Sequence, residues 1–313
     1  MSEKQIHKRL SVFCAAKLNL FLKVCEKQMD GYHRIETVFQ SIDLFDKISL
    51  EISPIDNKDK KPEINISLES SKQSHLVPTD KKNLMYQAAK LFFRKAEIQD
   101  TNLRIHIHKN IPVSGGLAGG STNAAATLCA LNYFFGELFS QTQLLDMCRE
   151  LGSDVPFCLL GGCMLGTGRG DQLTRLTFPK DLVFVLVFPP SDLELKAKDV
   201  YERYDLLQSK QPEEGRIEDF IKALLSDNKS NIAKKMMNSL EEAVISLSYW
   251  VEEATSLIDS VGYQSLVSGS GPTVFALAPN EAQGQALIRK LKEAGYEASL
   301  HRAVSEPFQL IAH

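Results

Sequence analysis

The sequence contains no long block of like charge, and its formal net charge is only -3. Proteins that bind nucleic acid usually carry a basic patch or stripe, so we do not expect nucleic acid as a partner. A long apolar run is also missing, because the apolar stretch at residues 18–24 is interrupted by Asn19 and Lys23. This stretch is too short and too polar for a membrane span or a signal peptide. We therefore expect a cytoplasmic protein that does not act at a membrane.

Closely spaced cysteine pairs are absent too, since no C-x-x-C motif occurs. The six cysteines are scattered and lie mostly in apolar stretches, a pattern typical of reduced, buried thiols in a reducing compartment. They are Cys14, Cys25, Cys129, Cys148, Cys158 and Cys163. The chain also has no internal repeat and no low-complexity segment, and nothing in it indicates an oligomeric state. Its 313 residues suffice for one large domain or two moderate ones.

Alternation of apolar residues predicts strands, whereas apolar residues at helical spacing predict helices. The predicted strands are residues 10–26, 35–44, 47–53, 63–69, 102–109, 182–188 and 297–304. The predicted helices begin after Asn83 and after the glycines near residue 115, and others span about residues 142–151, 199–207, 217–225, 240–260 and 281–294. Strands and helices do not alternate regularly, which favours an α+β fold over a doubly wound sheet. Predicted helices become more frequent after about residue 180, and this change predicts two domains, residues 1–180 and 181–313.

Residues 112–122, "PVSGGLAGGST", place four glycines directly ahead of a predicted helix. Glycine lets the main chain approach a ligand closely and adopt a positive φ angle. The first N–H groups of a helix and its dipole favour an anion, most often a phosphate. Ser121 and Thr122 would add hydroxyl donors, and either is a candidate magnesium ligand. Ser121 stands where a Walker A loop needs lysine, and no G-x-G-x-x-G fingerprint occurs here. The alternative is a turn that only packs tightly.

Four stretches of the sequence follow the order of a known set of motifs. They are "AAKLNLFLKV…DGYHRIETVFQSIDLFD" at residues 15–46, "PVSGGLAGGSTNAA" at 112–125, "GSDVPF" at 152–157 and "VSGSGPTVFAL" at 267–277. Together they resemble the GHMP kinase family, and the first and third resemble the members that phosphorylate a cytidine diphosphate-linked methylerythritol. The resemblance implies the GHMP kinase fold, with an N-terminal domain like domain 2 of ribosomal protein S5, a C-terminal ferredoxin-like domain, and ligands between them.

The resemblance also implies a reaction, because this family consists of ATP-dependent kinases. The chain would use ATP and Mg²⁺ to phosphorylate the 2-hydroxyl of that small-molecule substrate, on the non-mevalonate route to isopentenyl diphosphate. Asp154 would accept or orient the hydroxyl proton, and Lys17 would support it. Without the resemblance, Asp154 would be interpreted as a turn or helix-cap carboxylate and Lys17 as a snorkelling lysine. The ATP phosphates would be held by Pro112, Val113, Ser114, Gly115, Gly116, Leu117, Ala118, Gly119, Gly120, Ser121 and Thr122.

A second set of residues would bind the substrate. Asn19 shares a strand face with Lys17, because side chains two apart in a strand point the same way. Tyr32 and His33 follow a turn, and exposed on a loop they would stack on the cytosine and hydrogen-bond its edge, with Tyr201 on the other side of the ring. Ser268, Gly269, Ser270 and Gly271 would supply N–H donors near the transferred phosphate. The alternative for Asn19 is a solvated strand face. For Tyr32 and His33 it is a surface aromatic beside a titrating histidine, and for residues 268–271 it is a helix-to-strand turn.

The sequence departs from the family pattern at several positions. Ser114 and Ala118 stand where glycine is frequent, and an alanine forced to positive φ costs energy. Thr122 replaces a frequent serine, and Ala197 stands where the family often has threonine or serine. His106 and His108 could pair on a metal, although a solvated face is favoured, and "GTGRGD" at residues 166–171 is interpreted as a plain turn. Two other functions stay open: another GHMP kinase, such as homoserine kinase, or a catalytically silent ligand-sensing relative.

Overall fold

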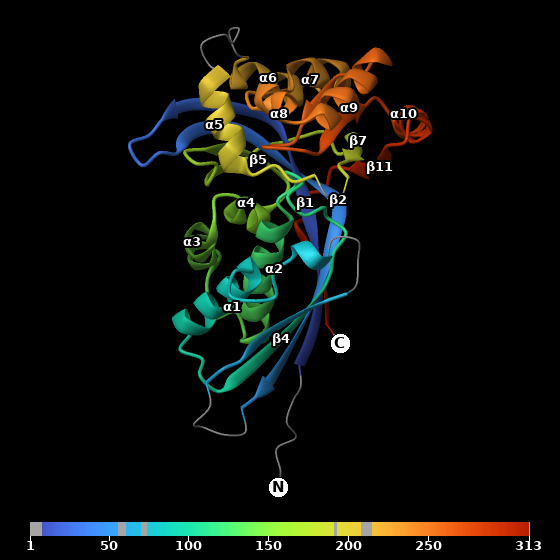
Figure 1. The fold of residues 1–313 in the computed structure, drawn as a ribbon. Helices are drawn as coiled ribbons and strands as arrows, with labels where there is room; N and C mark the ends of the chain where they lie inside the picture. Colours follow the sequence, from blue (N-terminus) through green and yellow to red (C-terminus); the bar gives the residue numbers. More distant parts are fainter. Residues whose placement is uncertain (1–7, 56–60, 70–73, 191–192, 208–214, 313) are drawn as a thin grey trace.

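The computed structural model describes residues 8–55, 61–69, 74–190, 193–207 and 215–312 (Figure 1). Within these ranges the strands form two sheets, one of eight strands and one of four. Figure 1 shows helices α1–α4 beside the lower part of the long strands β1 and β2, and helices α5–α10 around their upper part. This mixture confirms the predicted α+β class. Among the described helices, none has the length and apolar character needed to cross a membrane.

The eight-stranded sheet has the order β12–β1–β2–β4–β3, with β5, β6 and β8 attached at its sides. Its strands are β1 (Lys8–Lys27), β2 (His33–Pro54), β3 (Ile64–Leu68), β4 (Thr101–His108), β5 (Cys163–Thr167), β6 (Gln172–Arg175), β8 (Met237–Asn238) and β12 (Phe308–Ala312). The prediction of separate strands at residues 35–44 and 47–53 is wrong. The antiparallel ladder with β1 continues past an irregularity, with Phe45 opposite Ala15 and Asp46 opposite Cys14.

Four helices pack beside the lower part of this sheet, and one of them, α2, begins in the glycine-rich loop, residues 112–122 (Figure 1). They are α1 (Leu84–Lys95), α2 (Gly119–Phe134), α3 (Gln141–Leu151) and α4 (Val155–Leu160), and a short 3-10 helix, η1 (Ser74–Leu76), precedes α1. As predicted, Asn83 caps α1, because its side chain accepts a hydrogen bond from the Met85 N–H. Leu128 of α2 is buried in one cluster with Ile105 and Ile107 of β4. Burying each such side chain is worth roughly 1.5–3 kcal/mol, so the first turn of α2 is firmly placed.

The four-stranded sheet has the order β11–β7–β10–β9. Its strands are β7 (Val183–Phe188), β9 (Ser265–Val267), β10 (Val274–Ala278) and β11 (Glu297–Arg302). The helices around it are α5 (Ala197–Leu207), α6 (Ile217–Leu225), α7 (Lys229–Lys235), α8 (Glu241–Leu247), α9 (Tyr249–Ser260) and α10 (Glu281–Glu293). The predicted single helix at residues 240–260 is wrong. Ser248 has an extended backbone, with φ -147° and ψ 108°, and its side chain accepts from the Val251 N–H to start α9.

The two sheets share buried side chains and chain segments. Phe21 of β1 lies in one apolar cluster with Phe184 of β7 and Phe275 of β10. After β11 the chain returns to the large sheet, where β12 pairs antiparallel with β1. A boundary near residue 180 therefore separates the strands of the two sheets along the chain, except for β8 and β12. The division into two domains stays a prediction.

All six cysteines are free thiols. Four of them are buried, as expected, and Cys25 and Cys129 are partly buried. Burial raises the pKa of the Cys14 thiol to about 12, so this side chain is protonated and unreactive at neutral pH.

Glu241, in the first turn of α8, predicts a pH dependence of stability. Burial raises the pKa of its carboxyl from 4.5 to about 7, although the Val267 N–H donates to it at 3.0 Å and opposes the rise. The folded protein thus retains a proton that the unfolded chain releases. The free energy of unfolding therefore falls by roughly 3 kcal/mol as the pH rises from about 4.5 to 7.

We expect Glu241→Gln to remove this dependence, because the amide oxygen still accepts from Val267 and carries no charge. Urea unfolding of both proteins at pH 5 and pH 8 measures it. Relative to the wild type, the variant should have a higher free energy of unfolding at pH 8 than at pH 5. A difference that is the same at both pH values would contradict the assignment.

Candidate active site

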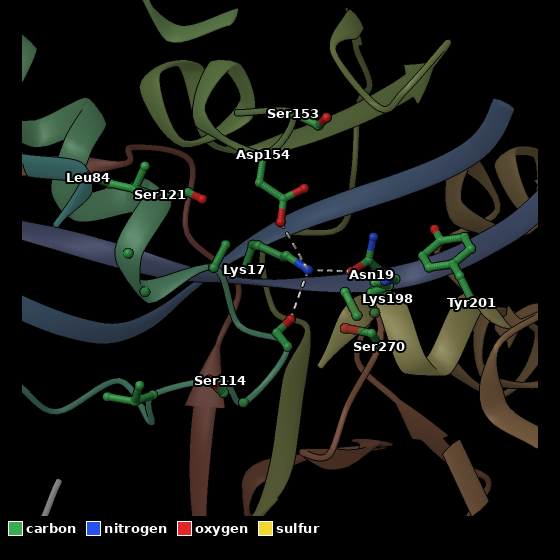
Figure 2. Close-up of a pocket in the computed structure, with 18 of the residues that line it drawn as sticks. Lys17, Asn19, Leu84, Ser114, Ser121, Ser153, Asp154, Lys198, Tyr201 and Ser270 are labelled. Carbon is green, nitrogen blue, oxygen red and sulfur yellow. Dashed lines mark hydrogen bonds and ion pairs between the residues drawn. The ribbon is translucent and has the colours of Figure 1, made fainter. Parts of the chain in front are cut away.

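A cavity of about 960 Å³ lies beside β1 and β2 of the eight-stranded sheet, and the loop after β9 closes part of it. Its walls come from β1, the turn after β1, the residues that begin α1, α2 and α4, the glycine-rich loop, α5 and the loop after β9. Segments that are far apart in the sequence therefore meet at one place. Figure 2 shows Ser121 and Tyr201 on opposite sides of a central Lys17, with Asp154 beside it. The cavity is large enough for a nucleotide-sized ligand at either side of this lysine.

The glycine-rich loop leads directly into α2, as predicted, and Gly119, Gly120 and Ser121 of the first turn line the cavity. Two of the positions that depart from the family pattern have a strained backbone, which the sequence analysis considered for Ala118 but not for Ser114. Ala118, the N-cap of α2, has φ 58°, and Ser114 has φ 55°. A side chain in this left-handed region costs roughly 1–2 kcal/mol, so the loop conformation is imposed by its surroundings.

Not every residue of the loop faces the cavity. Pro112, Val113 and Ser114 line it, whereas Leu117 and Thr122 do not. The Thr122 side chain is fully buried, because successive residues of a helix point about 100° apart and Ser121 takes the cavity side. A hydroxyl that meets a ligand here is therefore that of Ser121 rather than Thr122.

The loop after β9 supports the glycine-rich loop from behind. The Ser268 hydroxyl donates to the Gly116 carbonyl at 3.0 Å, and the Thr273 N–H donates to the Gly115 carbonyl at 3.3 Å. A Cβ atom on Gly116, which has φ 76°, would lie 2.1 Å from the Ser268 carbonyl oxygen. Of the four residues expected to face a phosphate, Gly269 and Ser270 line the cavity. Ser268 and Gly271 are instead buried in the contact between the loops.

Lys17 is buried, with 4% exposure, and it joins the strands to the loop. Its ammonium donates to the Asn19 amide oxygen at 2.6 Å and to the Gly116 carbonyl at 2.8 Å. The Asn19 amide nitrogen donates to the Thr37 hydroxyl, which itself donates to the Phe21 carbonyl. The Thr37 hydroxyl donates its single proton to the Phe21 carbonyl, so it can only accept from Asn19. The Asn19 side chain therefore turns its NH₂ group to Thr37 and its oxygen to Lys17. Asn19 and Lys17 thus share one strand face, as predicted.

Asp154 completes this polar cluster from a distant part of the chain. It precedes α4, and its carboxylate oxygen lies 3.8 Å from the Lys17 nitrogen. Its side chain is 38% exposed, whereas that of Lys17 is 5% exposed, so only the carboxylate is open to the cavity. The predicted pair is therefore in contact. A carboxylate beside a buried cation, at the edge of a phosphate-type loop, can take a proton from an alcohol that enters the cavity.

A buried carboxylate that the sequence analysis missed anchors the start of the loop. Asp46 is fully buried, and it accepts from the N–H groups of Asn110 and Ile111 at 2.8 and 2.9 Å. It also accepts from the Asn123 amide at 3.0 Å and forms an ion pair with Lys109, which lines the cavity. A buried charge is tolerated only when it is fully paired. An aspartate within an apolar strand could therefore have indicated from the sequence that Asp46 binds several donors.

The far end of the cavity carries aromatic side chains. Tyr32 is exposed, and the Arg169 guanidinium lies over its ring, 4.2 Å from the centroid. Arg169 comes from the predicted turn at residues 166–171, which joins β5 to β6 and also lines the cavity. The expectation that His33 is exposed is wrong: it begins β2, is 8% exposed and stacks on Tyr201 at 5.4 Å. Burial also raises the pKa of the Tyr201 hydroxyl.

The described part of the chain holds no cluster of three or more His, Cys, Asp or Glu side chains arranged for a metal ion. His106 and His108 lie on the outer face of β4, where they contact Ser67 and Glu69 respectively.

A glycine-rich loop at a helix start, with a lysine–aspartate pair in the same cavity, offers the positioning and charge stabilisation that phosphoryl transfer requires. Residues 83–162 match the model of the GHMP kinases N-terminal domain, and residues 220–297 match that of the GHMP kinases C-terminal domain. The chain belongs to the GHMP kinase family and is therefore a phosphotransferase that uses ATP.

Its relatives include the 4-diphosphocytidyl-2-C-methyl-D-erythritol kinases of two bacteria. That of Clostridium botulinum is 36% identical over 94% of this chain and 100% of the relative. That of Caldicellulosiruptor bescii is 37% identical over 88% of this chain and 92% of the relative. A crystal structure of 4-(cytidine 5'-diphospho)-2C-methyl-D-erythritol kinase covers 95% of this chain and 100% of that protein, with TM-score 0.74 and 27% identity. A homoserine kinase from Cytophaga hutchinsonii has the same TM-score at 18% identity, which shows the fold alone.

The contact between the loops predicts a sharp difference between two glycines. Gly116→Ala places a methyl group against the Ser268 carbonyl at a positive φ, and we expect it to lower the free energy of unfolding by more than about 2 kcal/mol. Gly120→Ala is the control, since the nearest atom to its Cβ, on Leu84, is 3.7 Å away. Urea unfolding measures both. Equal stability of the two variants would show that the loops are not in tight contact.

The anchor at Asp46 predicts a second effect. Asp46→Asn leaves Lys109 buried beside a neutral group, and we expect a loss of about 3–5 kcal/mol in unfolding free energy and a higher KM for ATP. Asp43→Asn, at a partly exposed acid of the same strand, should cost less. Urea unfolding and steady-state kinetics provide the two readouts. An unchanged KM for ATP in a folded Asp46→Asn protein would remove the proposed link to the loop.

Proposed function

We propose that this chain transfers the γ-phosphoryl group of ATP to the 2-hydroxyl of 4-diphosphocytidyl-2-C-methyl-D-erythritol, on the non-mevalonate route to isopentenyl diphosphate. The observation that carries this proposal is the cavity with the Lys17–Asp154 pair between a phosphate-type loop and an aromatic end. Relatives with this name that align over nearly the whole chain support it. The predicted domains, residues 1–180 and 181–313, would enclose the two substrates, and the enzyme would act in the cytoplasm.

In this proposal the residues act on charge and orientation. The N–H groups of the glycine-rich loop and the first turn of α2 would bind the ATP phosphates, assisted by Gly269 and Ser270 from the opposite loop. Asp154 would accept or orient the proton of the acceptor hydroxyl. The Lys17 ammonium would keep that carboxylate ionised and offset negative charge that develops on the transferred group. Asn19 holds Lys17 in place through its amide oxygen and lines the cavity beside it.

Mg²⁺ would accompany ATP, since it usually binds through phosphate oxygens and only one or two protein ligands. The Ser121 hydroxyl suits this arrangement, because it lines the cavity at the start of α2, beside the proposed phosphate site. When bound, Mg²⁺ would neutralise charge on the phosphates. Ser121 would help to hold it, and Thr122 would not, because its side chain is buried away from the cavity.

The aromatic end favours this substrate over that of another family member. Tyr32 offers an exposed ring, and Tyr201 and His33 form a stacked pair that lines the same cavity. A nucleotide base can use such surfaces by stacking, whereas an amino-acid alcohol such as homoserine gives no reason for them. A catalytically silent relative is disfavoured because Lys17 and Asp154 are both present and in contact.

A substrate panel tests the proposed function. With ATP and Mg²⁺, a coupled assay of ADP release should show turnover with 4-diphosphocytidyl-2-C-methyl-D-erythritol and little with homoserine or mevalonate. Turnover of homoserine without turnover of the cytidyl compound would contradict the substrate assignment.

The role of Asp154 has its own test. We expect Asp154→Asn to lower kcat by roughly a hundredfold or more, because the proton acceptor is lost, while ATP binds as in the wild type. Asp146→Asn, at an exposed acid on α3, is the control and should be fully active. Kinetics and calorimetric ATP titration measure the two effects. Near-normal kcat in Asp154→Asn would exclude Asp154 from the chemistry.

A further inference from the structure

The imidazole of His33 is held on several sides by helix α5. Its Nε2 atom lies 2.9 Å from the Asp205 carboxylate. The Tyr201 ring stacks on it with an interplanar angle of 23°, and the Tyr204 ring meets it edge-on at 6.2 Å. The side chain is almost entirely buried yet lines the cavity. The ring orientation is therefore determined before any ligand enters.

Asp205 is itself fixed by a second partner. One of its carboxylate oxygens contacts His33, and the other accepts from the Lys27 ammonium at 2.6 Å. Lys27 lies directly opposite His33 in the pairing of β1 with β2. Each carboxylate oxygen of Asp205 therefore has a partner of its own, His33 for one and Lys27 for the other.

This geometry determines which nitrogen of His33 carries the proton. An ionised carboxylate only accepts hydrogen bonds, so Nε2 must be the N–H that points to Asp205. In a neutral imidazole the other nitrogen, Nδ1, is then an acceptor. The hydrogen bond at one nitrogen sets the state of the other, as in a catalytic triad, where an aspartate holds the tautomer of the histidine. Among the described residues none provides a partner for Nδ1.

We propose that Asp205 is a positioning residue that, through the tautomer of His33, makes the enzyme select a base with an amino group over one with a carbonyl at the same ring position. An Nδ1 acceptor matches the 4-amino group of cytosine and repels the 4-carbonyl oxygen of uracil. This inference rests on the proposed function, because it concerns the base of the same substrate. Neither Asp205 nor Lys27 contacts the reacting atoms in this account.

Asp205→Asn should reverse the preference for the cytosine amino group over the uracil carbonyl. Lys27 makes the outcome definite, because it fixes the orientation of the new asparagine amide. Its ammonium can only donate, so it should bind the amide oxygen of the new asparagine and leave the amide NH₂ facing Nε2. Nε2 then becomes the acceptor and Nδ1 carries the proton. The ring would present a donor to the base, which suits the uracil carbonyl and not the cytosine amino group.

The test compares the cytidyl substrate with its uridyl counterpart at saturating ATP. In the wild type the ratio of kcat/KM should favour the cytidyl compound, and Asp205→Asn should lower this ratio by about tenfold or more. We expect the change in KM for the substrate, with KM for ATP unchanged. Asp199→Asn, at an exposed acid on the same helix that lies outside the cavity lining, is the matched control and should keep the wild-type ratio.

Nitrogen-15 NMR of the histidine rings at pH 7.5 gives a readout that does not depend on turnover. The His33 signals are assigned from their absence in His33→Gln. The wild type should show the Nε2–H tautomer and Asp205→Asn the Nδ1–H tautomer. A wild-type ring that is protonated on both nitrogens, or only on Nδ1, would overturn the inference even if the variant did not fold.

Different results would contradict the proposed function and the role of Asp205. No turnover of the cytidyl compound by the wild type would contradict the proposed function, and with it the selection argued here. A wild type that prefers the cytidyl compound, with an unchanged ratio in folded Asp205→Asn, would overturn the role of Asp205 alone.

Discussion

The site depends on one buried ammonium group. Lys17 bonds at once to a strand neighbour, Asn19, and to the carbonyl of Gly116 in the glycine-rich loop, and Asp154 lies beside it. Such a charge is tolerated in the interior because it is hydrogen-bonded and lies beside a carboxylate. The strand that carries the lysine, the loop that would bind phosphates and the segment that carries the carboxylate therefore have to come together in one geometry. The contacts that stabilise Lys17 in the fold are therefore the same contacts that would arrange the site.

The loop that meets this lysine is strained, and the protein holds it from two sides. Ser114 and Ala118 adopt left-handed backbone angles that cost energy for any residue with a Cβ. Behind the loop, Gly116 is in close contact with the segment that follows β9. At its start, Asp46 gathers several donors around the end of β4. A loop supported in this way keeps its N–H groups oriented without the ligand, which lowers the entropy lost on binding.

Much of this could be predicted from the sequence, for reasons that are local. Glycines before a helix, the strand around Lys17 and the α+β class follow from residue type and spacing. The contact between Lys17 and Asp154 could not be derived from spacing, because 137 positions separate them, and only resemblance to a family joined them. Burial of His33, the support from Asp46 and the position of Arg169 depend on which surfaces pack together. The break at Ser248 shows the opposite limit, since a local cap interrupted a helix that apolar spacing alone would continue.

The most direct measurement is a crystal structure of this chain with a non-hydrolysable ATP analogue and the cytidyl substrate. The account predicts that the acceptor hydroxyl lies within hydrogen-bond distance of Asp154, roughly 2.6–3.2 Å. It also predicts that the γ-phosphate lies between that hydroxyl and the first turn of α2, with the Lys17 ammonium beside the Asp154 carboxylate. A complex in which the hydroxyl is remote from Asp154, or in which the phosphates bind away from the glycine-rich loop, would contradict it.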